Sequence, residues 1–160
     1  MSVFISGSMS IKELPQEAQR SISTIIAKEI PILVGDAPGV DLLVQEYCKL
    51  KGYRSVKVYY SQKDNKDNKV TYPRNNIGNW SVCTVKVPTY ITGRDFYNRK
   101  DIRMTYDCKY GLCIFDGQSA GTLRNIKHLI VLGKKVAVIR KGVRVDVSTV
   151  EHIEGVLRNN

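Results

Sequence analysis

Residues 32–41 read Ile-Leu-Val-Gly-Asp-Ala-Pro-Gly-Val-Asp, an apolar run that turns at glycine and proline into a pattern with helical spacing. The same order of apolar strand, glycine turn and helix start recurs at residues 3–8 and 112–122. In an open α/β sheet the carboxyl ends of parallel strands share one edge, so the glycine turns that follow them meet around a single crevice. Backbone N–H groups and helix N-termini at such an edge bind anions. The three turns together therefore predict a crevice for a small molecule that carries phosphate.

Apolar runs and helical patterns alternate along most of the chain. We expect strands at residues 3–6, 32–34, 56–60, 110–115 and 136–139, and helices at residues 15–28, 40–51, 94–107, 121–132 and 148–157. Strands that alternate with helices of about ten to fifteen residues are typical of right-handed βαβ units. The predicted fold class is α/β, a three-layer α/β/α Rossmann-like domain with a mainly parallel sheet, and residues 1–160 are expected to form one domain.

Residues 61–79 interrupt this alternation. They repeat Lys, Asp and Asn, contain the pair Tyr72-Pro73, and end beside Trp80, the one tryptophan of the chain. Long segments of this composition between regular elements are surface loops in compact domains, and many of them serve a function. We therefore expect a mobile surface loop here, with Trp80 as an anchor in the core or in a lid rather than a stacking platform for a base.

Composition limits the classes of function. With 160 residues, 42% of them hydrophobic, the chain can bury one sizeable core. No apolar run reaches the roughly 20 residues of a membrane span and no signal segment opens the chain, so we expect a cytoplasmic protein with no membrane partner. Whether it forms a homo-oligomer stays open. The four cysteines, Cys48, Cys83, Cys108 and Cys113, lack the spacing of a zinc site or a disulfide scaffold and are expected to be free thiols.

The formal net charge of +10 raises the question of nucleic-acid binding, because Lys and Arg patches bind phosphate backbones. The basic residues are spread over residues 49–69, 94–109 and 134–144, often beside Asp, and form no dense stripe. A nucleotide-sized ligand is therefore favoured. Single-strand nucleic-acid binding stays an alternative function, with Trp80 or Tyr72 as the stacking surface.

The candidate ligand-binding residues lie in the three turns and on one helix. Several of them also have a structural interpretation, since Asp41 in a first helical turn complements the helix dipole and Ser119 is a suitable N-cap. Asp101 shares a helical face with Tyr97, although a charged residue on a helix is most often solvated. His128 and His152 lack partners at metal-ligand spacing, and the sequence indicates no metal ion and no cofactor. The candidates are Gly7, Ser8, Gly35, Asp36, Ala37, Gly39, Asp41, Asp101, Asp116, Gly117, Ser119, Gly121 and Thr122, with Asp41 and Asp101 also the candidate catalytic residues.

Four segments of the chain carry a family resemblance. They are Gly7-Ser8, residues 35–41, residues 96–101 (Phe-Tyr-Asn-Arg-Lys-Asp) and residues 116–126 (Asp-Gly-Gln-Ser-Ala-Gly-Thr-Leu-Arg-Asn-Ile). In this order they resemble the YspA-like branch of the SLOG superfamily, over residues 2–140. The superfamily comprises Rossmann-like nucleotide-binding proteins and includes the LOG phosphoribohydrolases and the DNA-processing DprA family. The resemblance implies a domain that senses or processes a nucleotide or a nucleotide-derived ligand, for example an ADP-ribose-like compound.

One position departs from the hydrolases of that superfamily. The LOG phosphoribohydrolases carry Gly-Gly-x-Gly-Thr-x-x-Glu, and the similar stretch of this chain ends in Asn125. An amide cannot supply the general base or the charge-stabilising carboxylate expected for N-glycosidic cleavage. We therefore expect a binding module, with phosphate on the N–H groups of Gly7-Ser8 and of Gly121-Thr122. Asp36 or Asp41 would then read the sugar or the base. An enzyme that acts on an N-glycosidic bond, as a phosphoribohydrolase or a nucleoside deoxyribosyltransferase does, is the alternative.

Overall fold

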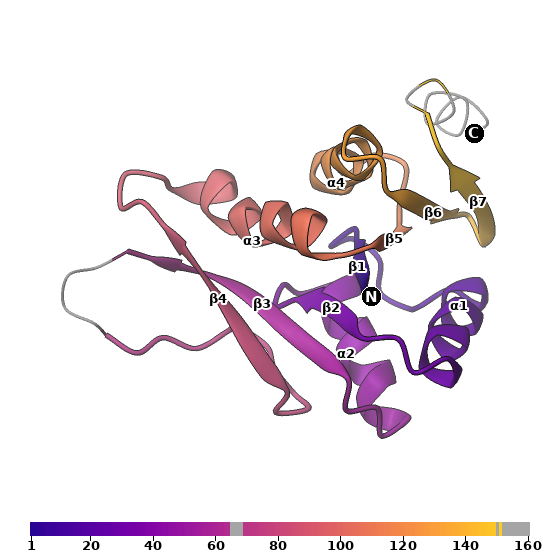
Figure 1. Cartoon of the computed structure of the whole chain (residues 1–160), viewed down its shortest axis with the longest axis horizontal. Coiled ribbons are helices and arrows are strands. Elements are labelled where there is room, and N and C mark those ends of the chain that lie inside the picture. The colour runs from indigo at the N-terminus through magenta and orange to yellow at the C-terminus, as the bar shows by residue number, and fades with distance from the viewer. Residues whose placement is uncertain (65–68, 150, 152–160) are drawn as a thin grey trace.

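In the computed structural model, which describes residues 1–64, 69–149 and 151, strands and helices alternate along most of the chain (Figure 1). Helices begin where the sequence places proline, glycine or an N-capping serine: Pro15 precedes the first, Gly39 the second and Ser119 the fourth. In chain order the elements are β1 (Val3–Gly7), α1 (Gln16–Ala27), β2 (Ile32–Gly35), α2 (Val40–Leu50), β3 (Val56–Lys63), β4 (Ser81–Val87), α3 (Gly93–Asp107), β5 (Tyr110–Ile114), α4 (Ala120–Val131), β6 (Lys135–Arg140) and β7 (Val143–Val147).

The described strands form one seven-stranded sheet in the order β4-β3-β2-β1-β5-β6-β7. All neighbouring pairs are parallel except β6 and β7, which are antiparallel. From β1 the chain adds strands first on one side, through β2 and β3, and later on the other side, through β5 and β6. The order therefore reverses between β1 and β5, and ligands of open α/β sheets bind outside the carboxyl ends of the strands at such a switch point.

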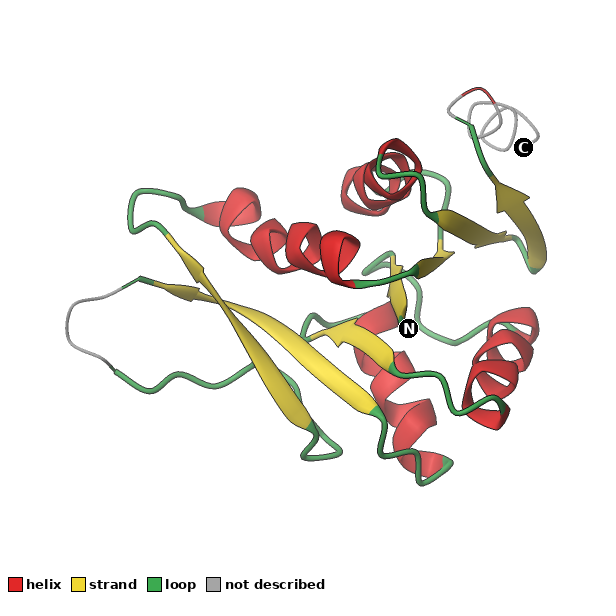
Figure 2. Cartoon of the chain, in the orientation of Figure 1, coloured by secondary structure: helices red, strands yellow, loops and turns green. Residues whose placement is uncertain are grey.

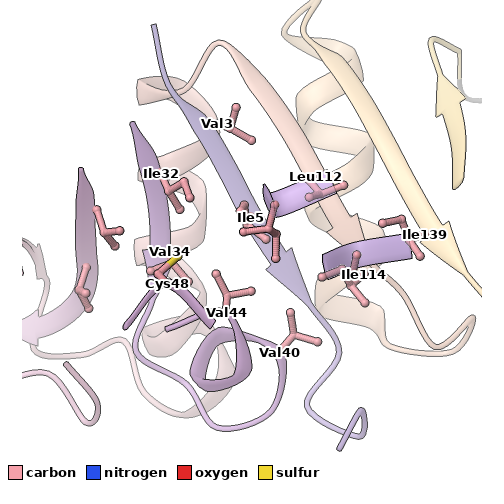
Figure 3. Close-up of a cluster of buried hydrophobic side chains, with 14 of the residues drawn as sticks. Val3, Ile5, Ile32, Val34, Val40, Val44, Cys48, Leu112, Ile114 and Ile139 are labelled. Carbon is pink, nitrogen blue, oxygen red and sulfur yellow. The ribbon is translucent and has the colours of Figure 1, made fainter. Parts of the chain in front are cut away.

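The sheet is covered on both faces. Alternate residues of each strand point to opposite sides, so Ile5 of β1 packs with Val44 of α2 on one face (Figure 3). On the other face Phe4 packs with Met104 of α3 and Ile126 of α4. Figure 1 shows α1 and α2 on one side of the sheet and α3 and α4 on the other. The prediction of a three-layer α/β/α Rossmann-like domain with a mainly parallel sheet is confirmed.

Two strands of the sheet were not expected from the sequence. β4 lies at one edge, where several of its side chains are exposed, so its sequence lacks a clear apolar run. β7 lies at the other edge and alternates valine with Arg144 and Asp146, the period of two that is typical of a half-covered strand. The predicted helix over residues 148–157 falls almost entirely outside the described residues, as does His152.

The expectation of a mobile loop over residues 61–79 is wrong at its start, whereas residues 69–79 contain no helix or strand, as expected of a loop. Residues 61–63 continue β3, which pairs in parallel with β4 through to Val87 (Figure 2). Toward the other end, the amide of Gln45, buried in α2, accepts a hydrogen bond from the N–H of Ile77 and donates to the carbonyl of Asn75. Trp80 is buried, and its indole N–H donates to the carbonyl of Tyr53 at 2.9 Å. Trp80 is therefore a core anchor, as expected.

The remaining expectations about composition concern cysteines and membranes. Cys48, Cys83, Cys108 and Cys113 are all free, and burial raises the pKa of the Cys48 and Cys113 thiols to about 12. Such thiols are unreactive packing residues, as predicted. No helix in the described part of the chain is both long enough and apolar enough to cross a membrane.

Candidate functional site

A cleft of about 630 Å³ lies at the carboxyl edge of the sheet. β1 ends at Gly7, which pairs with Ile114 at the end of β5, and β2 ends beside them at Gly35. The predicted gathering of the three glycine turns at one edge is thus confirmed. We call this space the cleft; its lining residues are Ser6, Gly7, Met9, Ser10, Ala37, Asp41, Arg74, Arg94, Tyr97, Asn98, Lys100, Asp101, Asp116, Gln118, Ser119, Ala120, Gly121, Thr122, Arg124 and Asn125.

The candidate residues divide into those that line the cleft and those that support its wall. The lining candidates are Gly7, Ala37, Asp41, Asp101, Asp116, Ser119, Gly121 and Thr122. The supporting candidates are Ser8, Gly35, Asp36, Gly39 and Gly117. Gly39 and Gly117 both have positive φ angles, 82° and 86°, which explains glycine at these turns without a ligand.

Asp36, just after β2, is engaged within the protein. Its carboxylate accepts two hydrogen bonds from Arg74, one from the guanidinium Nη2 and one from the backbone N–H, each at 2.8 Å. Its own carbonyl accepts from the side chain of Asn75. Asp36 is 4% exposed and does not line the cleft. Arg74, which is bound to Asp36, lines the cleft instead.

A lysine between two aspartates forms a charged cluster beneath the cleft. Lys100 of α3 is 4% exposed, and its Nζ lies 2.8 Å from Asp101 Oδ1 and 3.8 Å from Asp41 Oδ2. Burial lowers the pKa of Lys100, but the charges of Asp101 and Asp41 outweigh burial and raise it, so Lys100 is a cation. Burial raises the pKa of Asp41 to about 7, against the opposing charge of Lys100.

Gly35 and Asn125 allow this charged cluster to form at the end of β2. A Cβ on Gly35 would collide with the Asp41 carboxylate and lie 2.9 Å from Lys100 Nζ, so only glycine leaves room for both charged groups. Asn125 of α4 donates from Nδ2 to Asp101 Oδ2 at 3.2 Å. Asn125 therefore holds a carboxylate that comes from α3.

The turn after β5 is stabilised by its own aspartate. Asp116 accepts hydrogen bonds from Ser10 Oγ at 2.7 Å and from the N–H groups of Gln118 and Ser119 at 2.8 and 2.7 Å. Burial alone would raise the pKa of Asp116, but these hydrogen bonds outweigh it and lower the pKa. Asp116 is therefore an anion at the edge of the cleft.

Ser8 supports the cleft from below. Its N–H donates to the carbonyl of Ile114 at 3.0 Å, and its hydroxyl accepts from the N–H of Asp116 at 3.1 Å. The side chain is fully buried and lies 3.3 Å from the Thr122 hydroxyl. The expectation that the Ser8 N–H holds a phosphate is wrong, because the end of β5 already occupies it. Gly7 is required by packing, since a Cβ there would lie 2.5 Å from the Ile114 carbonyl.

The N-terminus of α4 is the open part of the site. Ser119 is the N-cap, and its Oγ accepts from the N–H of Thr122 at 3.4 Å, so the structural interpretation of Ser119 is confirmed. The N–H groups of the two residues between them, Ala120 and Gly121, have no acceptor within the helix, as at any helix start. A Cβ built on Gly121 meets nothing within 4 Å. Gly121 therefore leaves space beside the first turn of α4, where it and Ala120 line the cleft.

Sequence reasoning missed all four cationic residues of the site. Lys100 lies four positions before the buried Met104, which places it on the inner face of α3 and is a signal that was available. Arg74 carried no such signal, because its position depends on the distant Asp36. The missed lining residues are Ser6, Met9, Ser10, Arg74, Arg94, Tyr97, Asn98, Lys100, Gln118, Ala120, Arg124 and Asn125.

Over residues 1–64, 69–149 and 151, no group of three or more His, Cys, Asp or Glu side chains is placed to hold a metal ion. His128 instead packs its ring against Tyr106 at 6.3 Å between centroids. No protein-family model matches this chain, and no curated protein matches it either.

Proposed function

We propose that the cleft binds a nucleotide or a nucleotide-derived small molecule. The observation that carries the proposal is the N-terminus of α4, whose first residues line the cleft at the β1/β5 switch point of the sheet, with open space beside Gly121. Phosphate binds at helix N-termini because the first N–H groups have no internal partner and the helix dipole favours negative charge there.

The side chains around this helix start suit a phosphate. The hydroxyls of Ser119 and Thr122 lie 3.2 Å apart at the first turn of α4, and Arg124 lines the cleft one turn further along. Four cationic and three acidic side chains line the cleft, and the raised pKa of Asp41 reduces the negative charge near neutral pH. The field in the cleft therefore favours an anion.

Polar side chains elsewhere in the cleft suit the rest of a nucleotide. Asp41 and Asp101 accept hydrogen bonds from sugar hydroxyls or base amino groups, and Asn98 and Gln118 can both donate and accept. Tyr97, with 45% of its surface exposed, supplies an aromatic ring at the same wall. Ligand pockets of this kind combine apolar surface with a few polar groups that orient the ligand.

Cleavage of an N-glycosidic bond is the second candidate function, and the charged cluster favours it. Asp41, with its raised pKa, is a carboxyl group suited to donating a proton to a leaving base. Asp101, which lines the cleft and is held by Lys100 and Asn125, offers a carboxylate against the positive charge that develops on the sugar. Asp101 thus provides a carboxylate in the cleft, although residue 125 is an asparagine.

Calorimetric titration with the four common nucleoside 5′-monophosphates and with ADP-ribose tests the binding proposal. Gly121→Asp places a carboxylate at the helix start, and we expect it to weaken binding by about tenfold or more while leaving the melting temperature nearly unchanged, because the site of the new Cβ is open. Gly121→Ala is the matched control, with the same backbone and no charge, and should retain binding. Unchanged affinity in Gly121→Asp would refute the placement of phosphate at α4.

Chromatography of the same mixtures separates the two candidate functions. Binding without release of free base supports the binding module. Catalytic release of base that disappears in both Asp101→Asn and Asp41→Asn identifies the enzyme instead, with the two carboxyl groups in the roles given above.

A further inference from the structure

Arg74 is held in a fixed position at the β2 end of the cleft. Both its guanidinium and its backbone N–H bind the carboxylate of Asp36, which is itself buried. Its guanidinium carbon lies 4.3 Å from the centre of the Tyr97 ring. A guanidinium that is bonded on one edge and stacked on one face keeps few conformations, so it binds a ligand with little loss of entropy.

The guanidinium retains donors for a ligand. Arginine has five N–H groups, and among the described residues the side-chain hydrogen bond of Arg74 uses only Nη2. The side chain is 35% exposed and lines the cleft. Guanidinium groups bind phosphate and carboxylate through two parallel, charge-assisted hydrogen bonds, which are stronger than hydrogen bonds to neutral groups.

The backbone that carries Arg74 is also fixed. Gln45, fully buried in α2, bonds to the carbonyls of Gly35 and Asn75 and to the N–H of Ile77. Asn76 closes the next turn through two hydrogen bonds with the backbone of Trp80. These part-buried hydrogen bonds hold an irregular connection against α2, and their effect is to place Arg74 at the cleft.

Arg74 and the α4 N-terminus both line the cleft but belong to different strand ends. Asp36, which holds Arg74, follows β2, whereas α4 follows β5, and β1 lies between these two strands. Neighbouring strands lie about 4.8 Å apart, so the ends of β2 and β5 are separated by roughly 10 Å, and we take this as the spacing of the two anion positions. That separation corresponds to the body of a nucleoside. Adjacent phosphates of a diphosphate share one bridging oxygen and are too close together to reach both ends.

We infer that Arg74 is a second anion-recognition residue and that the ligand is a nucleotide with a further anionic group at a separate position, such as a phosphate on the ribose. The inference rests on the proposed function, since it takes the first phosphate to lie at α4. It gives Asp36 the role of positioning Arg74 and assigns to Arg74 the discrimination between singly and doubly anionic nucleotides.

Calorimetric titrations test this with the 5′-monophosphates of adenosine, guanosine, cytidine and uridine, each beside its 5′-diphosphate and its 3′,5′-bisphosphate. For the base that binds, we expect the bisphosphate to bind about tenfold more tightly than the monophosphate, and the diphosphate to gain less. Arg74→Gln should reduce the affinity for the bisphosphate to that for the monophosphate. Arg74→Lys keeps the charge without the two parallel hydrogen bonds, and should fall between these values.

Arg99→Gln is the matched control, because Arg99 is exposed on α3 and does not line the cleft. It removes the same charge and should leave the preference for the bisphosphate intact. Equal affinity of the wild-type protein for monophosphate and bisphosphate overturns the inference and leaves the proposed function standing. A bisphosphate preference that survives in Arg74→Gln overturns the role of Arg74. If no member of the panel binds the wild-type protein, the proposed function fails and the inference fails with it.

Discussion

The turns after β2 and β5 have the same plan in sequence, an apolar strand, glycines with aspartate, and a helix start, yet they do different things. The β2 turn is filled: Asp36 is bound by Arg74, and Asp41 is buried against Lys100. The β5 turn is open: Asp116 bonds to the turn itself, and nothing stands in front of Gly121. A glycine turn thus predicts the path of the backbone, whereas distant residues such as Arg74 and Lys100 decide which polar groups stay available to a ligand.

Removing Lys100, the cation of α3 that contacts Asp41 beside the β2 turn, should have the largest effect on stability. Lys100→Met leaves the buried Asp41 and the part-buried Asp101 without their counter-charge, and we expect a loss of about 3–5 kcal/mol in the free energy of unfolding, measured by urea denaturation at neutral pH. Lys127→Met on the exposed side of α4 is the control and should change stability by less than about 0.5 kcal/mol. A loss below about 1 kcal/mol in Lys100→Met would show that the cluster is already solvated.

Replacing a glycine by alanine should have the next largest effect, and the effect should differ between the two turns. Gly35→Ala forces a Cβ against the Asp41 carboxylate and Lys100, and should cost about 1–3 kcal/mol by overpacking. Gly121→Ala meets open space in the first turn of a helix, and alanine is favoured there by up to about 1 kcal/mol. Urea denaturation of both variants should therefore give free-energy changes of opposite sign. Equal losses would contradict the distinction between a filled and an open turn.

The two turns should also differ in their response to pH. The pKa of Asp41 is raised from 3.8 to about 7, so the folded protein binds more protons than the unfolded chain between these values. Stability should therefore fall as the pH rises through this window, and Asp41→Asn should abolish that slope. Asp116, whose pKa is lowered, contributes stability that is present above about pH 4 and lost as the pH falls below it.

Urea denaturation across this pH range measures both slopes. Asp146→Asn is the control, because the Asp146 side chain is 83% exposed. It should leave the slope of stability against pH unchanged between pH 3.8 and about 7, the two pKa values of Asp41. A slope that persists in Asp41→Asn would assign the effect to another group.

Removing the negative charge of Asp116, in the turn after β5, should have the smallest effect. Asp116→Asn keeps an oxygen that accepts from the N–H groups of Gln118 and Ser119 but removes a negative charge beside the phosphate position. We expect the affinity for a nucleoside 5′-monophosphate to rise about two- to fivefold in calorimetric titrations, the equivalent of about 0.3–1 kcal/mol. Reduced affinity would mean that Asp116 itself contacts the ligand.

Sequence analysis predicted the backbone of the site better than its side-chain chemistry. Apolar runs and glycine turns identified β1, β2 and β5 and the edge at which Gly7, Gly35 and Gly117 gather, because these signals are local. The edge strands β4 and β7 were missed, since an edge strand is covered on fewer sides and its sequence is correspondingly less apolar.

The engagement of Asp36 and Ser8 could not be read from local pattern either. Asp36 binds Arg74, 38 positions away, and the N–H of Ser8 donates to Ile114 across the sheet. Contacts between residues so far apart in the sequence form only when the strands pair in the folded sheet. Lys100 is the exception: it was missed as well, although its helical spacing from Met104 is a local signal that it lies on the inner face of α3.

The anchoring of Trp80 gives the protein a built-in optical reporter. Trp80 is the sole tryptophan, its ring is buried against the core, and Arg54 lies 5.9 Å from the ring centre. The intrinsic fluorescence of the chain at tryptophan wavelengths thus comes from the end of the segment that presents Arg74. A red shift in that emission before global unfolding would record the release of Trp80 from Tyr53 and Asn76, without any added label.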